Sequence, residues 1–139
     1  MGTSLYMAAI PADELESVTE ENVLEVLLAG WSGDQVGWAV AGLPFGERGI
    51  RVFESSGPRI FGLEAEIIRP EVRDKLATNA ADEDTVRERF RAQAFGLELP
   101  LGVVPLQEHE DRLVDEAMQV RALIIDAAAH DKTVIFTLF

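Results

Sequence analysis

The chain ends in a segment, TVIFTLF (residues 133–139), that is apolar on both faces when it is extended. Successive side chains of a strand point to opposite sides of the sheet. One side then carries Val134, Phe136 and Leu138, and the other carries Ile135, Thr137 and Phe139. A strand that is apolar on both sides needs cover on both faces of its sheet. The segment therefore predicts an interior strand between two covering layers.

A long amphipathic helix is predicted before this strand, from about Glu110 to Ala129. Apolar residues recur there at helical spacing and form the expected buried stripe: Leu113, Ala117, Val120, Ile124 and Ala128.

Two shorter helices are predicted upstream of the long one. Pro70 suits the first position of a helix, which would turn Val72 and Leu76 inward. Asp82 or Asp84 can cap the next helix, over about residues 84–94. Its apolar stripe is Val86, Phe90 and Ala94, and its exposed side carries Glu83, Arg87 and Arg91 at a spacing that permits ion pairs.

The N-terminal third predicts a strand, a turn and a helix. Residues 3–10 read as a strand that stops at Pro11, and a helical turn follows. Thr19 is the expected N-cap of a helix over about residues 20–29, with Val18 and Val23 packed across the cap. Gly30 is expected to end this helix. Its core-facing stripe would be Leu24, Leu27, Leu28 and Trp31.

Glycines punctuate residues 30–49, which predict a long connection of a kind that often carries function. Residues 49–54 and 59–68 predict two strands, and residues 97–106 are expected to be extended because prolines exclude a helix interior. We therefore expect a single α+β domain over residues 1–139. Its small mixed or antiparallel sheet of about four strands would pack against the long C-terminal helix and the shorter helices.

Composition excludes several classes of function. The chain of 139 residues has no cysteine, so disulfides, thiol catalysis and thiolate metal sites are ruled out. Its net charge of −13 argues against a nucleic-acid binder, whose affinity rests on contacts to phosphate. No apolar run approaches the roughly 18 residues that a membrane span needs. With no basic stretch near the start to serve as a secretory signal, we expect a cytoplasmic protein.

The charge is distributed unevenly along the sequence. Residues 1–47 contain no lysine or arginine, and they hold eight acids: Asp13, Glu14, Glu16, Glu20, Glu21, Glu25, Asp34 and Glu47. Two interpretations stay open. The acids form either a solvated surface that keeps the protein soluble, or a docking surface for a basic partner.

Catalytic motifs are weak or missing. The glycines at 42, 46 and 49 do not have the spacing of a dinucleotide-binding loop. Gly30-Trp31-Ser32 begins a nucleophile elbow, but Asp34 stands where the second glycine belongs. Glu64 and Glu66 would lie about 7 Å apart on one strand face, as paired catalytic carboxylates can, or would simply face water.

The two histidines are not placed like ligands of one metal. His109 lies in the acidic run EHED, which is typical of a solvated helix N-terminus, and His130 suits a C-terminal capping position. Trp31 and Trp38, with Phe45 and Phe53, could anchor the glycine-rich connection or line a pocket. We expect no catalytic residue, no metal site and no cofactor.

The order of features from Gly57 onward resembles the YfbM-like family, a bacterial family of unknown function. The resemblance lies in GPRIFGLEAEIIRPEV, RERFRAQAF, the helix that ends in AAAH, and the start TSLYMAAIPADELE. It covers residues 1–20 and 57–139, and Arg59 matches a frequent arginine. It implies an α+β fold and supplies no catalytic residue.

We expect a bacterial protein that acts by binding a protein partner with a basic surface, as an immunity protein or antitoxin does. The alternative is a small hydrolase that uses carboxylates or the 30–49 loop.

Overall fold

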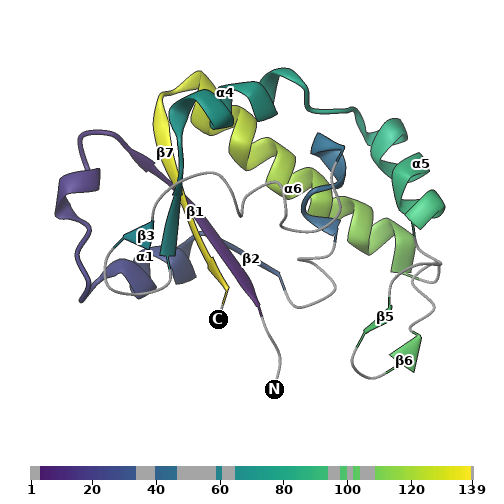
Figure 1. The fold of residues 1–139 in the computed structure, drawn as a ribbon, viewed down its shortest axis with the longest axis horizontal. Helices are drawn as coiled ribbons and strands as arrows, with labels where there is room; N and C mark the ends of the chain where they lie inside the picture. The colour runs from purple at the N-terminus through teal and green to yellow at the C-terminus, as the bar shows by residue number, and fades with distance from the viewer. Residues whose placement is uncertain are drawn as a thin grey trace.

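A computed structural model describes residues 4–33, 40–46, 59–60, 65–93, 98–99, 102–103 and 109–138. These residues build an α+β fold around a five-stranded sheet in the order β2-β1-β7-β4-β3 (Figure 1). The strands are β1 (Leu5–Pro11), β2 (Trp31–Gly33), β3 (Arg59–Ile60), β4 (Ala65–Ile68) and β7 (Lys132–Leu138). All four pairings are antiparallel, so the expected sheet is antiparallel rather than mixed.

The terminal strand β7 is the centre of the sheet, as the apolar pattern predicts. It pairs with β1 along its whole length and with β4 on its other edge. Val134, Ile135 and Phe136 are all buried, although alternate residues face opposite sides. Both faces of the sheet are therefore covered.

Different helices cover the two faces. On one face, α6 (Glu110–Ala129) and α4 (Pro70–Thr78) pack on Leu5, Met7, Val134 and Phe136. On the other face, α1 (Val23–Ala29) and the short 3-10 turn η1 (Leu15–Ser17) cover Ala8, Ile10, Ala65 and Ile135. Figure 1 shows α6 and α1 on opposite sides of the paired strands β1 and β7.

The N-terminal half of α6 belongs to a second core away from the sheet. Here α5 (Glu83–Gln93) and the 3-10 turn η2 (Leu43–Phe45) bring Val86, Phe90 and Leu43 against Leu113 and Ala117. Figure 1 shows α5 beside this half of α6 and α4 beside the other half. The predicted α6 stripe is confirmed up to Ile124, beyond which Ala127 rather than Ala128 is buried.

Two predictions about strands are wrong in detail. Residues 59–68 do not form one strand, because β3 and β4 pair with each other in antiparallel fashion. The start of the glycine-rich connection is not loop, since β2 pairs with β1 from Leu5 to Met7. The extended 97–106 segment contains a second small sheet, β5 (Glu98–Leu99) with β6 (Gly102–Val103). Residues 49–54 lie outside the described residues.

The predicted start of the helix over residues 20–29 is also wrong. Helix α1 begins at Val23, and Asn22 rather than Thr19 occupies the N-cap position. The buried face is consequently made by Val23 and Leu27, whereas Leu28 is 55% exposed. Gly30 does end the helix.

Candidate functional site

The face of the molecule formed by residues 13–25 is strongly acidic. This acidic segment runs through η1 into α1, and its six carboxylate side chains are all exposed: Asp13, Glu14, Glu16, Glu20, Glu21 and Glu25. The sequence has no lysine or arginine between residues 4 and 33 to neutralise them. Asp34 and Glu47, the other two acids of this part of the chain, lie outside the described residues.

Apolar and polar contacts fix the backbone of the acidic segment. Val18 and Val23 are buried in the same cluster on the sheet. The Asn22 amide nitrogen donates to the Ser17 carbonyl oxygen at 2.8 Å, and its oxygen accepts from the Thr19 backbone N–H at 2.7 Å. The Ser17 hydroxyl donates to the carbonyl oxygen of Glu14 at 2.6 Å. These bonds occupy backbone atoms, and among the carboxylates only Glu21 accepts a bond within the segment, from the Thr19 hydroxyl at 3.4 Å.

A groove of about 330 Å³ lies between this segment and the sheet. Its sides come from β1, η1 and α1, and its lining residues are Ala8, Ala9, Ile10, Pro11, Glu14, Ser17, Val18, Val26, Ala29 and Gly30. We call it the β1 groove. Small and aliphatic residues make most of the surface, and Glu14 is the ionisable residue among the described lining residues.

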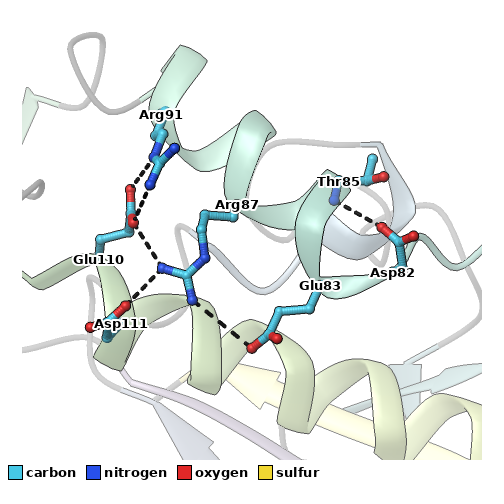
Figure 2. A network of polar contacts seen from close by, with 7 residues as sticks. All are labelled: Asp82, Glu83, Thr85, Arg87, Arg91, Glu110 and Asp111. Atoms are coloured by element: carbon cyan, nitrogen blue, oxygen red, sulfur yellow. Dashed lines mark hydrogen bonds and ion pairs between the residues drawn. The ribbon is translucent and has the colours of Figure 1, made fainter.

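A second polar cluster joins α5 to the start of α6 (Figure 2). Arg87 donates to Glu110 at 2.8 Å and to Asp111 at 2.7 Å, and Arg91 donates to Glu110 at 2.7 and 3.0 Å. The two guanidinium groups lower the pKa of Glu110 to about 2. Within α5 itself, Arg87 lies 4.0 Å from Glu83. The ion pair expected along the helix is thus longer than the ion pairs that join the two helices.

This cluster accounts for the acidic run around His109. Two of its carboxylates hold arginines from another helix, while His109 is the exposed residue that precedes α6. Within the part of the chain that the structure describes, no group of three histidine or acidic side chains could hold a metal ion. The acidic run therefore joins α5 to α6 through ion pairs.

Sequence reasoning does not find the buried cation Arg73. Its side chain is 5% exposed and lies between α4 and the start of β7. It donates to the Lys132 carbonyl oxygen at 2.8 Å, to Asp131 at 3.2 Å and to the neighbouring Asp74 at 3.0 Å. A spacing of 58 residues between Arg73 and Asp131 leaves no local pattern that could reveal this contact.

Among the described residues, the remaining candidates do not converge on one site. Ser32 lies in the middle of β2 opposite Tyr6, after a helix, which reverses the strand-to-helix order of a nucleophile elbow. The Trp31 indole N–H donates to Gln119 on α6 at 3.1 Å, so this ring anchors β2 to the helix. Phe45 likewise packs against the core. Trp38 and Phe53 lie outside the described residues.

One residue of the candidate carboxylate pair lies in the described part of the chain, and so does the C-terminal histidine. Glu66 on β4 lies opposite Arg59 on β3, while Glu64 is outside the described residues. Glu66 shares the α4 side of the sheet with Ile68, so this face is not simply solvated. His130 occupies the C-cap of α6, and its Nδ1 lies 3.0 Å from the carbonyl oxygen of Asp126, as a capping role predicts.

Fold and site together define a small α+β protein with an acidic face and a neighbouring groove. Comparison of the chain with protein-family models, with curated proteins and with solved structures finds no match in any of the three. The resemblance to the YfbM-like family stays a prediction. Among the described residues, no helix is long and apolar enough to cross a membrane.

Proposed function

We propose that this chain is a protein-binding module whose acidic segment docks onto a basic surface of a partner protein. An immunity protein or antitoxin that covers another protein acts in this way. The cytoplasm of a bacterium is the proposed setting. The observation that carries the proposal is the exposure of all six carboxylates of residues 13–25 on one segment without a basic residue.

Electrostatics supports a docking role for such a surface. Charges of one sign that lie close together create a potential that attracts an oppositely charged partner from a distance. Elsewhere on the molecule, carboxylates such as Glu110 and Asp126 are matched by Arg91 and Lys132. The segment differs in that the sequence places no base near it. Its carboxylates stabilise the fold little, because isolated surface charges contribute little to stability.

The proposal is tested by comparing two variants with the same change of net charge. Glu16→Gln, Glu20→Gln and Glu25→Gln together neutralise the acidic segment. The matched control, Glu71→Gln, Asp84→Asn and Glu88→Gln, neutralises three exposed acids on α4 and α5. A partner is captured at low salt with the native chain, and its association rates with all three proteins are then measured.

We expect the segment variant to slow association strongly and the control variant to slow it little, since steering depends on local potential. Raising the salt from 0.05 to 0.5 M shortens the Debye length from about 14 to about 4 Å, so salt should remove most of the difference. Circular dichroism checks that both variants fold. Equal association rates for the two variants would mean that the acids keep the protein soluble and do not dock a partner.

A further inference from the structure

The β1 groove lies against a part of β1 that β2 does not cover. Strand β2 pairs with β1 only from Leu5 to Met7. The Met7 carbonyl oxygen points towards Gly30, because a Cβ on Gly30 would lie 2.2 Å from it. In an antiparallel ladder the direction of the peptide groups alternates from residue to residue. Ala9 therefore directs its N–H and C=O to the same side as Met7, into the groove.

This uncovered edge is suited to an extended peptide. The Pro11 carbonyl oxygen already accepts the Glu14 N–H at 2.9 Å, so the turn into η1 closes one end of the edge. At the other end Gly30 leads into β2. An extended segment that pairs with a sheet edge gains main-chain hydrogen bonds, and the pockets beside the edge select its side chains.

The lining of the groove indicates which side chain it selects. Ile10, Val18 and Val26 give aliphatic surface, and Glu14 adds an exposed carboxylate. Long basic side chains lay their methylene stems on apolar surface and keep the charged head in water. The acidic segment, which contributes Glu14 to the lining of the groove, complements such a head and repels an acidic one.

We propose that the β1 groove binds an extended segment of the partner protein and takes up an arginine side chain. The backbone of the segment pairs with Ala9, the stem of the arginine lies on Val18 and Val26, and its guanidinium meets Glu14. This inference rests on the proposed function and specifies where on the acidic face the partner docks.

The test uses the full chain labelled with ¹⁵N and the peptide acetyl-Thr-Val-Arg-Val-Thr-amide, followed by amide chemical shifts. A peptide with citrulline in place of arginine has the same shape without the charge. We expect saturable shifts at Ala9, Ala29 and Gly30, and about fivefold weaker binding of the citrulline peptide, as for one partly exposed ion pair.

Two substitutions that each remove one negative charge show where the arginine of the peptide binds. Glu14→Gln should weaken binding of the arginine peptide about fivefold, whereas Glu21→Gln, on the same segment but outside the groove, should weaken it less than twofold. Ala29→Phe places a ring at the exposed end of α1 and should abolish binding by filling the groove. The amide spectrum of each free variant reports whether it is folded.

The outcomes separate this inference from the proposed function. Shifts confined to residues 20–25, or equal effects of Glu14→Gln and Glu21→Gln, would overturn the groove and leave an acidic docking face. An absence of saturable shifts up to millimolar peptide would also overturn the groove. In that case the association rates of the segment and control variants still decide whether the acidic segment docks a partner.

Discussion

Replacing Ile135 with alanine tests whether α1 seals the second face of the sheet. Ile135 is 0% exposed and packs in the cluster that contains Val23 and Leu27 of α1. An isoleucine-to-alanine change in a core costs about 2–5 kcal/mol, through lost transfer free energy and the cavity left behind. A central strand covered on both faces cannot collapse around the cavity easily, so we expect about 3.5 kcal/mol at this position.

The structure supplies a matched control in the neighbouring strand. Ile67 on β4 lies directly opposite Ile135 in the β4–β7 pairing, and it is only partly buried in the same cluster. Ile67→Ala removes the same atoms and should cost about 1.5 kcal/mol because solvent can reach part of the site. Leu28→Ala, on the exposed side of α1, should cost only a few tenths of a kcal/mol.

Urea denaturation measures these differences directly. A slope of about 1.5–2 kcal/mol per molar converts 3.5 kcal/mol into a midpoint lower by about 2 M for Ile135→Ala. Ile67→Ala should lower the midpoint by less than about 1 M, with an unchanged slope in both variants. If Ile135→Ala shifted the midpoint no more than Ile67→Ala, α1 would not cover this face and the position of the acidic segment would be wrong.

Three further changes test other parts of the fold. Truncation after Lys132 removes the centre of the sheet and should abolish cooperative thermal unfolding, because the buried side chains lost are worth several kcal/mol of a total of about 5–15. Asn22→Ala should cost about 1–2 kcal/mol in urea and Thr19→Ala much less, because the Asn22 side chain makes two bonds to the backbone of the turn whereas the Thr19 hydroxyl makes one long contact, 3.4 Å, to the exposed Glu21. Glu110→Gln should destabilise above pH 4.5 but not at pH 2, because the lowered pKa of Glu110 confers stability that is lost between these values; pH-dependent melting curves compare the two proteins.

Elements with a strong local signal could be predicted from the sequence. The helical spacing of the apolar residues predicts the bounds of α6, and Pro70 marks the first residue of α4. Asp82 caps α5 by accepting the Thr85 N–H at 2.9 Å, a bond that lowers the pKa of Asp82. Each of these signals depends on residues within a few positions of one another. The two-sided apolar pattern of β7 is equally local, and it also fixed the layering of the sheet.

Features that depend on distant partners could not be predicted. Thr19 and Asn22 are both residue types that cap helices, and residue type alone does not show that the Asn22 side chain bonds back to Ser17 and Thr19. The division of residues 59–68 depends on β4 reaching β7, which lies far along the chain. The charge of the acidic segment is visible in the sequence. The groove beside it is not, because the groove requires the pairing between β1 and β2 to end at Met7 of β1.

Gly30 shows how one local signal can hide a second, non-local requirement. As a helix stop it is an ordinary residue, and its φ of −88° is negative and does not by itself require glycine. What demands glycine is the close approach of β1, since a Cβ would lie 2.2 Å from the Met7 carbonyl oxygen and 2.9 Å from the Ala8 Cβ. The same contact holds the end of α1 against β1 and so sets one wall of the groove. A glycine needed for packing and one needed for capping look alike in a sequence, and the width of the proposed binding site depends on the packing role of Gly30.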